Sequence, residues 1–454
     1  MGEGLRHCSV RQATCGGGCS KRMADLVIDP SKGITGELTP PGDKSLSHRA
    51  VIFAAIAEGR TEITGFLPGE DTLNTAKAVR MLGITVEEKG PGILSVQGKG
   101  LNGLSEPSGV LDLGNSGTGM RLLAGLLAGQ DFFSVLTGDQ YLVKRPMGRI
   151  VEPLRAMGAV IDGRSGGKLA PLAIRGAGRN VKPLSFQSPV ASAQVKSAII
   201  LCGLYADGVT TVTEPHKSRD HTERMLRFFG ASVKEEGLGV SVRGKQPLRA
   251  RGTLEIPADI SSAAFFMVAA STVPGSDILI RNVGVNPTRT GIIDVLVSMG
   301  ADISLLAPRE QAGEPVADIR IRYRRLHAAT VKGDIIPRSI DEIPVIAVAA
   351  ATASGKTIIK DAAELRVKES DRIATIATEI RKMGAVVNEL PDGLEITGRE
   401  RLDGATCESH GDHRIAMSLA VAGLAATGQT VVRDTEWIET SFPGFERMLR
   451  QSAY

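Results

Sequence analysis

Apolar residues gather in six segments that are apolar on nearly every face of a helix, which is typical of helices buried on all sides. The six segments are residues 47–59, 117–129, 192–208, 261–275, 340–355 and 413–428. Each segment closes on a glycine, a residue that suits the left-handed position at the end of many helices. A strand-like run follows each glycine. The pattern therefore predicts six buried helices, each leading into a strand.

A second set of segments is apolar on one face only, which predicts amphipathic helices. Five of them end at a glycine: residues 71–83, 147–158, 220–230, 288–300 and 370–384. A strand opening follows each one, as in "AVID" after Gly158 and "ADIS" after Gly300. Residues 442–450, "FPGFERMLR", form a sixth copy that the C-terminus cuts short.

Together these segments define a repeating unit of buried helix, strand, amphipathic helix and two strands. The unit occurs six times at a spacing of roughly 70 residues, which is too long for a solenoid repeat of about 20–45 residues. Three units make a domain of about 200 residues, so the 454 residues divide into two domains. We therefore predict an α/β fold in which sheets cover the buried helices from the outside.

The starts of the buried helices combine capping residues with positive charge. Ser, Asp, Asn or Gly precedes each helix, and these residues commonly cap helices. Lys44, Arg49, Lys196 and Arg414 also lie at these starts, where a cation opposes the helix macrodipole. Because free backbone N–H groups at a helix start favour anions, we expect anionic ligands there. If the two domains turn these ends toward each other, a small, multiply charged substrate would lie in the cleft between them.

Three further stretches are rich in basic residues, and the second and third also contain carboxylates. They are "LVKRPMGR" (142–149), "HKSRDHTER" (216–224) and "LRVKESDR" (365–372). Arginine suits carboxylates and phosphates because it can donate two parallel hydrogen bonds to either. Asp341, Glu342 and Glu369 supply carboxylates for proton transfer.

Composition excludes several classes of partner. The chain has 54 basic and 50 acidic residues, a balance that does not suit a general polyanion binder. Aromatic residues make up only 4%, which argues against stacking on single-stranded nucleic acid. No apolar run approaches the ~18 residues of a membrane span. We therefore expect neither nucleic acid nor a membrane as a partner. Separately, we expect the protein to be a monomer.

The five cysteines are few, odd in number and scattered. They form no disulfide framework, so we expect a reducing compartment and a cytoplasmic protein. "CGGGC" (15–19) lacks the second pair of ligands that a metal site would need. Residues 1–22 have no apolar core of a secretory signal, and we expect them to form a disordered leader.

Nine motifs occur in one order along the chain: "PGDKSLSHR", "GNSGTGMR", "KRPMGR", "ASAQVKSA", "DHTE", "NPTRTG", "IDEIPVIAVAA", "LRVKESDR" and "DHRIAMS". Over residues 26–450 the chain thereby resembles the 5-enolpyruvylshikimate-3-phosphate synthase family. The resemblance implies a two-domain, inside-out α/β barrel with six βαβαββ-type repeats, three in each domain. It also implies two chain crossings, so that residues 23–42 and 258–454 form one domain and 43–257 the other.

The implied reaction transfers the carboxyvinyl group of phosphoenolpyruvate to the 5-hydroxyl of shikimate 3-phosphate and releases phosphate, on the way to chorismate and the aromatic amino acids. No metal or organic cofactor is implied. By resemblance, the residues expected to bind shikimate 3-phosphate are Lys44, Ser45, Arg49, Ser192, Ala193, Gln194, Arg219, Asp341 and Lys368. Those expected to bind phosphoenolpyruvate are Lys44, Gly117, Arg145, Gln194, Arg372 and Arg414.

Asp341, Glu369 and Lys44 are the expected catalytic residues. Asp341 would take the proton from the attacking hydroxyl, and Glu369 would protonate the methylene carbon. Glu369 must then be protonated part of the time, so we expect its pKa to be raised. Lys44 and Arg145 would neutralise the leaving phosphate. The family inhibitor glyphosate would occupy the phosphoenolpyruvate site beside Gly117.

One departure and two alternatives accompany this interpretation. Many family members have Lys where this chain has Thr440, in "ETSFPGF". The sister enzymes that act on UDP-N-acetylglucosamine share the fold, but they usually carry a Cys in the loop that here reads "YLVKRPMGR". A non-catalytic polyanion-binding protein could use the same helix starts, although it would not need Asp341 and Glu369 beside the cations.

Overall fold

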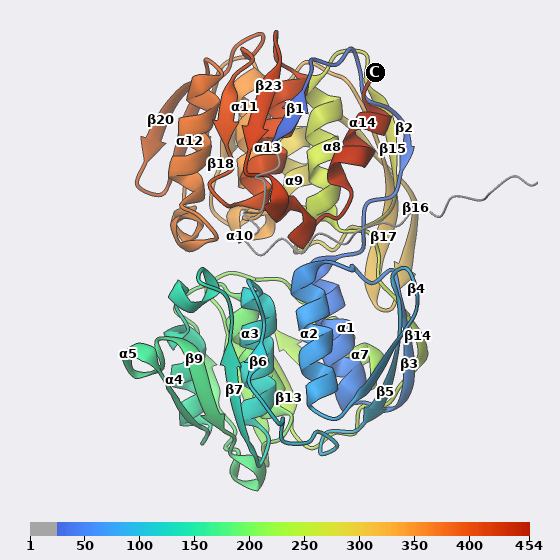
Figure 1. The fold of residues 1–454 in the computed structure, drawn as a ribbon, viewed down its shortest axis with the longest axis vertical. Coiled ribbons are helices and arrows are strands. Elements are labelled where there is room, and N and C mark those ends of the chain that lie inside the picture. Colours follow the sequence, from blue (N-terminus) through green and yellow to red (C-terminus); the bar gives the residue numbers. More distant parts are fainter. Residues whose placement is uncertain (1–24) are drawn as a thin grey trace, which may run out of the picture.

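The computed structural model describes residues 25–454, which form two lobes stacked along the long axis (Figure 1). The leader predicted for residues 1–22 lies outside the described residues. The lower lobe contains the elements from α1 to β14, and the upper lobe contains β1, β2 and the elements from α8 to α14.

Helices and strands alternate along the lower lobe. Its helices are α1 (Lys44–Ile56), α2 (Glu70–Met81), α3 (Gly117–Ala128), α4 (Gly148–Ala156), α5 (Arg164–Gly167), α6 (Ala193–Gly203) and α7 (His221–Phe228), with short 3-10 helices η1 (Leu142–Lys144) and η2 (Gly178–Asn180). Its strands are β3 (Glu58–Thr64), β4 (Thr85–Gly90), β5 (Ile93–Lys99), β6 (Leu111–Asp112), β7 (Phe133–Thr137), β8 (Val160–Gly163), β9 (Leu169–Arg175), β10 (Ser185–Gln187), β11 (Val209–Thr213), β12 (Val233–Glu236), β13 (Gly239–Arg243) and β14 (Gly252–Glu255).

The upper lobe repeats this alternation. Its helices are α8 (Ile260–Thr272), α9 (Gly291–Ser298), α10 (Ile335–Ser339), α11 (Ile343–Thr352), α12 (Arg372–Lys382), α13 (His413–Leu424) and α14 (Phe445–Ser452), with 3-10 helices η3 (Ala363–Val367) and η4 (Glu436–Thr440). Its strands are β1 (Leu26–Ile28), β2 (Thr35–Leu38), β15 (Asp277–Gly284), β16 (Asp302–Gln311), β17 (Glu314–Arg322), β18 (Thr330–Val331), β19 (Lys356–Ile359), β20 (Val386–Leu390), β21 (Gly393–Thr397), β22 (Thr406–Glu408) and β23 (Thr430–Arg433).

The strands form six small sheets, one for each predicted unit. The four-stranded sheets have the orders β14-β3-β5-β4, β6-β7-β9-β8, β10-β11-β13-β12, β2-β15-β17-β16 and β18-β19-β21-β20. In each of them the first two strands are parallel and the other pairings are antiparallel. The sixth sheet, β22-β23-β1, borrows β1 from the N-terminal end of the described chain. The sixfold repeat predicted from the sequence is therefore confirmed.

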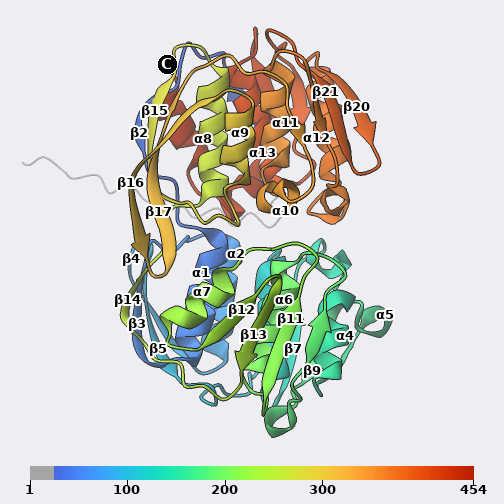
Figure 2. The ribbon, with the colours of Figure 1, turned by 180° about the vertical axis from the view of Figure 1, so that it is seen from behind.

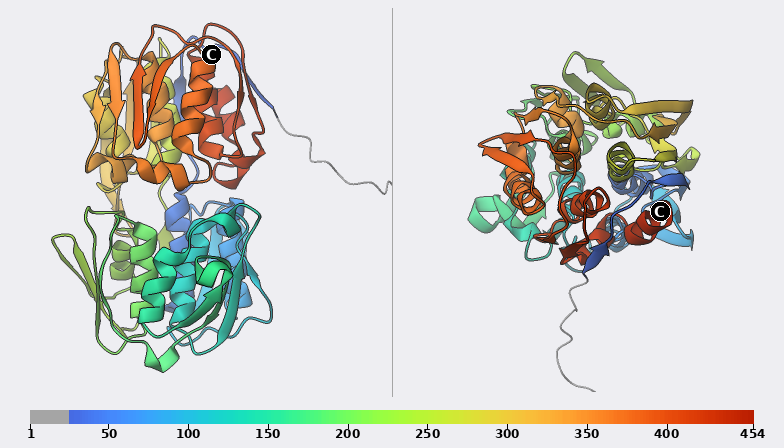
Figure 3. Two further views of the ribbon diagram at one scale, coloured as in Figure 1. Left: turned by 90° about the vertical axis from the view of Figure 1, so that its left-hand side faces the viewer. Right: turned by 90° about the horizontal axis from the view of Figure 1, so that it is seen from above.

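The six helices predicted to be buried lie inside the lobes. In α8 every residue from Ile260 to Ser271 is buried, and burial of one large apolar side chain contributes about 1.5–3 kcal/mol. In the view from above in Figure 3, such helices lie toward the middle and strands toward the outside. Small residues allow close packing, since a Cβ on Gly125 of α3 would lie 2.3 Å from the Ala198 carbonyl of α6. Among the described residues, no helix is long and apolar enough to span a membrane.

Side-chain caps fix the starts of five of these six helices. Asp43, Ser116, Ser192, Asp259 and Asp412 accept hydrogen bonds from backbone N–H groups of α1, α3, α6, α8 and α13. These bonds satisfy donors that the first turn of a helix leaves without partners. The capping residues that the sequence showed therefore hold the helix starts from which the candidate site residues project.

The chain crosses between the lobes twice, and the two crossings lie side by side. β2 comes just before α1 in the chain, but it pairs with β15 in the upper lobe. β14 comes just before α8, but it pairs with β3 in the lower lobe. The Asp43 N–H donates to the Pro257 carbonyl at 2.9 Å, and the Asp259 N–H donates to the Pro41 carbonyl at 2.9 Å. The crossings therefore form one double-stranded link between the lobes.

The buried apolar residues separate into two clusters along the same division. One cluster contains residues from 26–38 and 260–449. The other contains residues from 46–256. Each lobe thus has its own hydrophobic core, and the double-stranded link joins the two.

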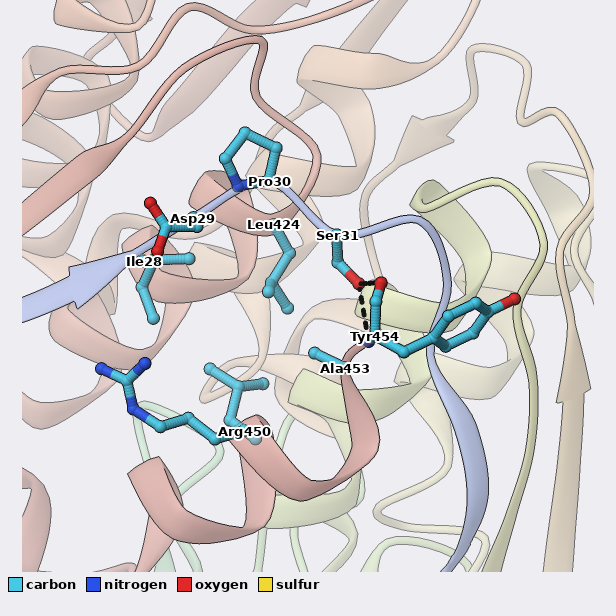
Figure 4. Close-up of a pocket in the computed structure, with 9 residues that line it drawn as sticks. Ile28, Asp29, Pro30, Ser31, Leu424, Arg450, Ala453 and Tyr454 are labelled. Atoms are coloured by element: carbon cyan, nitrogen blue, oxygen red, sulfur yellow. Dashed lines mark hydrogen bonds between the residues drawn. The ribbon is translucent and has the colours of Figure 1, made fainter.

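A long hairpin and the C-terminal residue complete the architecture. The β16–β17 hairpin reaches from the upper lobe to the lower lobe (Figure 2), where the Gly313 carbonyl accepts a hydrogen bond from Arg224 at 2.9 Å. The C-terminal residue Tyr454 is held beside the segment after β1 by a bond from Ser31 Oγ to its backbone oxygen (Figure 4). The cavity of about 220 Å³ beside this contact is lined by residues from the two ends of the described chain.

The prediction that closing glycines are left-handed was correct at most sites but wrong at two. Gly83, Gly158 and the other glycines that close the five amphipathic helices have positive φ. Gly129 and Gly428, at the ends of two buried helices, do not. Gly129 serves close packing instead of a left-handed turn, because a Cβ there would lie 2.2 Å from the Tyr205 ring.

Candidate active site

The predicted site residues come from both lobes and meet where the lobes face each other. Arg145 of the lower lobe lies 3.3 Å from Glu369 of the upper lobe, measured from Nη1 to Oε1. Arg219 of the lower lobe lies 2.5 Å from Asp341 of the upper lobe, measured from Nη2 to Oδ2. Two predicted cations therefore contact the two predicted proton-transfer carboxylates across the interface between the lobes.

Arg372 is the centre of the upper-lobe half of the site. Only 1% of its side chain is exposed, and its guanidinium contacts three carboxylates. The contacts are to Asp412 at 2.8 Å, to Glu369 at 2.7 Å and to Asp341 at 3.3 Å. Burial alone would lower the pKa of Arg372, but the Asp412 and Glu369 charges raise it above its ordinary value. Arg372 is therefore a permanent buried cation whose orientation is fixed on several sides.

The expectation of a raised pKa for Glu369 was wrong for this structure. Burial favours the protonated form of Glu369, but the charges of Arg372 and Arg145 hold its pKa well below the usual range. The same balance applies to Asp341, where Arg219 and Arg414 oppose the effect of burial and hold the pKa well below its usual range. Both carboxylates are thus ionised when only the protein's own cations surround them.

Lys368 and Arg414 complete the upper-lobe half. Lys368 Nζ lies 3.8 Å from Asp341 Oδ1, and burial lowers the Lys368 pKa. Arg414 follows the capping residue of α13 and donates to the backbone oxygen of Asp341 at 3.1 Å. All five predicted upper-lobe residues, including Glu369 and Arg372, therefore contact one another directly or through Asp341.

In the lower lobe, the loop from η1 to α4 brings Arg145 to the start of α3. Arg145 donates to Asn115 Oδ1 in a short hydrogen bond. A Cβ on Gly117 would lie 3.1 Å from Arg145 Nη1 and 3.2 Å from Arg121 Nη1. The glycine therefore gives two arginines room beside the first turn of α3.

The start of α6 holds the predicted trio Ser192, Ala193 and Gln194. Ser192 caps the helix, and its N–H donates to Glu214 Oε1 at 2.8 Å. Gln194 accepts from Arg121 at 2.5 Å and donates to Thr118 at 2.9 Å. These bonds tie the start of α6 to α3, and through Arg121 to the surroundings of Gly117.

The cations at the start of α1 have different surroundings. Lys44 contacts Asp71 at 3.1 Å, and Ser45 directs its backbone oxygen to Arg49. Arg49 is buried and donates to Thr222, Ser197 and the Ser45 oxygen. Burial lowers the Arg49 pKa to about 10. Arg49 lies beneath the surface that Lys44 and Ser45 help to form.

One sequence argument was wrong. Lys196 was interpreted as a helix-start cation that needs an anionic ligand. Its Nζ instead contacts Glu214 at 2.9 Å and Glu223 at 2.7 Å, and all three side chains are at most 2% exposed. Two buried glutamates therefore balance its charge within the protein.

Four further polar residues of this region were not singled out by the sequence analysis. Asn115, Arg121 and Asp71 are partners of Arg145, Gln194 and Lys44, respectively. His413 is buried, and its Nε2 has no hydrogen-bond partner among the described residues. Burial and the Lys44 charge hold the His413 pKa well below its usual range. Asn115, Arg121 and His413 lie within quoted motifs, so their position beside recognised residues was the available signal.

Comparison with known proteins decides the family. The model for EPSP synthase (3-phosphoshikimate 1-carboxyvinyltransferase) matches residues 28–449. The chain belongs to the EPSP synthase family. Among family members named 3-phosphoshikimate 1-carboxyvinyltransferase, that of Citrifermentans bemidjiense is 57% identical and the alignment covers 94% of this chain and 99% of the relative. That of Pelotomaculum thermopropionicum is 59% identical, with 94% and 98% covered.

Solved structures of the EPSP synthase family confirm the fold class predicted from the sequence. An EPSP synthase structure from Acinetobacter baumannii superposes with a TM-score of 0.86 at 46% sequence identity. The match covers 95% of this chain and 98% of that chain. The two-domain, inside-out arrangement of six α/β units is therefore the fold of this chain. The family is one of enzymes, which sets aside the alternative of a non-catalytic polyanion-binding protein.

Proposed function

We propose that the surface between the lobes, around Arg145, Arg219, Asp341, Glu369 and Arg372, is the active site of an EPSP synthase. The enzyme transfers the carboxyvinyl group of phosphoenolpyruvate to the 5-hydroxyl of shikimate 3-phosphate and releases phosphate. The observation that carries the site assignment is the pair of contacts between lobes, Arg145 with Glu369 and Arg219 with Asp341. Each contact joins an anion-binding arginine to a carboxylate suited to proton transfer.

The phosphoenolpyruvate site is proposed around Arg372, Arg414 and Arg145. Arg372 and Arg414 flank Asp341, and together they can bind the substrate carboxylate through parallel hydrogen bonds. Arg145, with Lys44, neutralises the phosphate as it leaves. Arg121 bonds to Gln194 and lies beside Gly117, so the Gln194 side chain and the Gly117 backbone border this space. The phosphate and the carboxylate would thus contact cations of different lobes.

The shikimate 3-phosphate site is proposed over the starts of α1 and α6, with Asp341 and Lys368 facing it from the upper lobe. Lys44 and Ser45 open α1, while Ser192 caps α6 and Ala193 and Gln194 open it. Arg219 approaches from the start of α7 and already contacts a carboxylate oxygen of Asp341. A substrate phosphate can replace that carboxylate as the partner of Arg219. Arg49, which is buried, supports this surface from below.

The proposed chemistry is addition followed by elimination. Asp341 accepts the proton of the 5-hydroxyl as its oxygen bonds to the central carbon of phosphoenolpyruvate, while Glu369 gives a proton to the methylene carbon. In the second half, the bond from carbon to phosphate oxygen breaks, the methyl group returns a proton to Glu369, and Asp341 passes the hydroxyl proton to the departing phosphate. Once the substrate carboxylate and phosphate engage Arg372 and Arg145, the positive field at Glu369 weakens and its pKa rises. Glu369 would thereby become able to hold the proton that it transfers.

We also propose domain boundaries and a cellular setting. The boundaries are 23–42 with 258–454 for one domain and 43–257 for the other, and the two separate cores support them. Both cysteines among the described residues, Cys202 and Cys407, are free and buried, which supports a reducing cytoplasm. A monomer is proposed, and analytical ultracentrifugation tests it.

Phosphate release from phosphoenolpyruvate tests the function directly. We expect release only when shikimate 3-phosphate is present. Asp341→Asn and Glu369→Gln should each lower turnover by roughly 100-fold or more while binding of shikimate 3-phosphate changes much less. Asp334→Asn and Glu364→Gln are matched controls, because these carboxylates are exposed and pair across the lobes with His216 and Arg149. Release that requires UDP-N-acetylglucosamine instead of shikimate 3-phosphate would support the alternative enzyme. Near-normal turnover of Asp341→Asn or Glu369→Gln would remove the altered residue from the mechanism.

A further inference from the structure

A buried polar cluster lies at the double-stranded link between the lobes, apart from the proposed substrate contacts. Its centre is Arg289, in the upper-lobe loop between β15 and α9, with only 3% of its side chain exposed. Arg289 Nη1 donates to Asp43 Oδ2 at 3.0 Å. Its Nη2 donates to Asp259 Oδ1 at 3.1 Å and to Ser261 Oγ at 2.7 Å. One guanidinium therefore bonds to the residues that follow both chain crossings.

The two carboxylates also cap the helices that begin at the crossings. Asp43 uses its other oxygen to cap α1, the first helix of the lower lobe. Asp259 caps α8, the first helix of the upper lobe after the second crossing. A fixed Arg289 therefore sets the distance between the starts of these two helices.

The cluster extends from Arg289 to two more helix starts. Ser261 donates to Glu342, the residue just before α11, in a short hydrogen bond. On the other side, Arg289 Nη1 lies 3.4 Å from His221 Nε2 at the start of α7. His221 Nδ1 lies 2.8 Å from Glu314, at the tip of the β16–β17 hairpin. Four helix starts from both lobes thus share one buried network.

Asn286, in the same loop as Arg289, strengthens the branch toward α7. Its side-chain amide donates to Asp220 at 2.6 Å and to Glu314 at 2.8 Å. Asp220 is the residue just before α7. The loop therefore reaches the start of α7 by two routes, one through His221 and one through Asp220.

Three acids of the network each adjoin a proposed substrate or proton-transfer residue in the chain. Asp43 precedes Lys44, Asp220 follows Arg219, and Glu342 follows Asp341. Because adjacent residues share a peptide unit, a displacement of the network acid displaces its neighbour. Arg289 therefore acts on Lys44 through Asp43, on Asp341 through Ser261 and Glu342, and on Arg219 through His221 and Asp220, and it bonds to none of these three residues.

We propose that Arg289 is a positioning residue that fixes Lys44, Arg219 and Asp341 relative to one another and remains the pivot when the lobes move. This inference rests on the proposed function, since it names these three as shikimate 3-phosphate contacts. The distinct consequence is that loss of the bridge weakens shikimate 3-phosphate binding more than phosphoenolpyruvate binding. Of the three residues, only Lys44 also belongs to the proposed phosphoenolpyruvate site, which depends chiefly on Arg372, and Asp412 and Glu369 orient Arg372 independently of Arg289.

Arg289→Lys tests the proposal, because lysine keeps the charge but lacks the planar fork that bonds two carboxylates at once. We expect the KM for shikimate 3-phosphate to rise at least 10-fold, with the KM for phosphoenolpyruvate at saturating shikimate 3-phosphate changing less than 3-fold. Arg281→Lys is the matched control. Arg281 also bridges two carboxylates, those of Glu37 and Asp318, but at the surface of the same lobe, and its KM values should match the wild type.

A rescue and a milder variant separate positioning from folding. Asp259→Asn leaves an adequate helix cap and leaves the introduced lysine a single carboxylate, Asp43, to bind. When Asp259→Asn is added to Arg289→Lys, the increase in the logarithm of the KM for shikimate 3-phosphate should shrink by at least half. If Arg289→Lys does not fold, Ser261→Ala removes the hydroxyl that connects Arg289 to Glu342, leaves both carboxylate contacts of Arg289 in place, and should raise that KM about 3-fold.

The outcomes are distinct. If the wild type releases phosphate only with shikimate 3-phosphate and both Arg289→Lys and Ser261→Ala keep wild-type KM values, the positioning role is wrong. The positioning role is also wrong if the KM values for both substrates rise equally or if Arg281→Lys behaves as Arg289→Lys does. If the wild type shows no release that depends on shikimate 3-phosphate, the proposed function fails, and the positioning role fails with it.

Discussion

At the scale of single residues, Arg372 sets the charge state of the proposed active site. It is almost fully buried and meets Asp341, Glu369 and Asp412. A buried cation is tolerated only where anions and hydrogen bonds compensate its lost hydration. The carboxylates therefore remain ionised without substrate, and anionic substrates must compete with them for the same cations.

The depressed pKa of Glu369 predicts how the substrate-free protein responds to acid. A carboxylate whose pKa is lowered by folding stabilises the folded state above its unfolded pKa of about 4.3 and loses that contribution as the pH falls. Glu369→Gln removes this titration. We expect the free energy of unfolding to fall less steeply in the variant than in the wild type between about pH 5 and pH 3, measured by urea denaturation.

Glu364→Gln provides the control for that comparison. Glu364 and its partner Arg149 are both more than 40% exposed, and such surface pairs contribute little to stability. This control should follow the wild-type pH dependence. An identical slope for Glu369→Gln and wild type would show that Glu369 is not held ionised by Arg372 and Arg145.

Gly117 offers a second test at this scale. A Cβ at this position would come within 3.1–3.2 Å of Arg145 and Arg121, so Gly117→Ala narrows the space beside both arginines. A methyl overlap in a packed site costs about 1–3 kcal/mol, and glyphosate, the longer ligand, should lose more than the substrate. We expect glyphosate inhibition that is competitive with phosphoenolpyruvate, with an inhibition constant that rises roughly 10-fold in the variant. The KM for phosphoenolpyruvate should rise less.

Gly148→Ala is the matched control, since a Cβ there would be 3.5 Å or more from its neighbours. It should leave both constants unchanged. A wild type that tolerates glyphosate as well as Gly117→Ala does would make the loop around Arg145 the deciding contact instead. Thr440 supplies no cation to this region, because its side chain is uncharged, and its hydroxyl donates to the Trp437 carbonyl.

At the scale of elements, the start of α6 depends on one buried lysine. Lys196 pairs with Glu214 and Glu223, and Glu214 also holds the Ser192 N–H and the Ser218 hydroxyl. Lys196→Met would leave two buried carboxylates without their cation. Breaking such a buried cluster typically costs about 3–5 kcal/mol, and we expect a loss of that size in the free energy of unfolding.

Lys245→Met is the control for this element. Lys245 pairs with Asp207 at the surface, where both side chains are more than half exposed, and removal of such a pair changes stability by at most about 0.5 kcal/mol. Chemical denaturation of the two variants makes the comparison. A loss below about 1 kcal/mol in Lys196→Met would mean that the glutamates are protonated or hydrated in the folded protein.

The helices, strands and their repeat were predictable because each element has its own local pattern. The buried helices α8 and α13 are apolar on most faces, and glycines such as Gly300 and Gly384 end the amphipathic ones. The pairing of strands was harder to predict from the sequence. β1 completes the sixth sheet from the opposite end of the chain, and no local signal specifies a partner about 400 residues away.

For the candidate site, the charge pattern of the sequence indicated the basic stretches, and the resemblance to the family supplied the individual residues. Arg145 and Arg372 are examples, and both lie at the interface between the lobes. Lys196 was misinterpreted because its compensating glutamates, Glu214 and Glu223, lie outside its own helix. The Arg289 network was not foreseen for the same reason, since its members come from six separate segments.

At the scale of the whole molecule, two lobes with separate cores are joined by one double-stranded link and by contacts across their facing surfaces. Those contacts are mostly ion pairs, such as Arg145 with Glu369 and Arg219 with Asp341. Ion pairs are weakened when a new anion binds the same cation. Substrate binding and the relative position of the lobes are therefore coupled.

Trp437 reports on this coupling. It is the only tryptophan of the chain, it lies in η4 of the upper lobe, and its ring meets that of Tyr141 of the lower lobe edge-on, with centroids 5.4 Å apart. Two anions repel each other unless cations are drawn between them, so we expect shikimate 3-phosphate to bind first and to complete the phosphoenolpyruvate site as the lobes close. Shikimate 3-phosphate alone should then change the Trp437 emission, whereas phosphoenolpyruvate alone should not.

Tyr141→Leu supplies the control for this experiment, because it removes the ring that Trp437 contacts without touching the proposed substrate residues. The emission change on addition of shikimate 3-phosphate should shrink in this variant while turnover stays within about 3-fold of wild type. Small-angle scattering provides an independent measure, with the radius of gyration decreasing when shikimate 3-phosphate is added. An equal emission change with phosphoenolpyruvate alone would overturn the binding order, and an unchanged radius of gyration with both ligands would overturn the closure that the order is meant to explain.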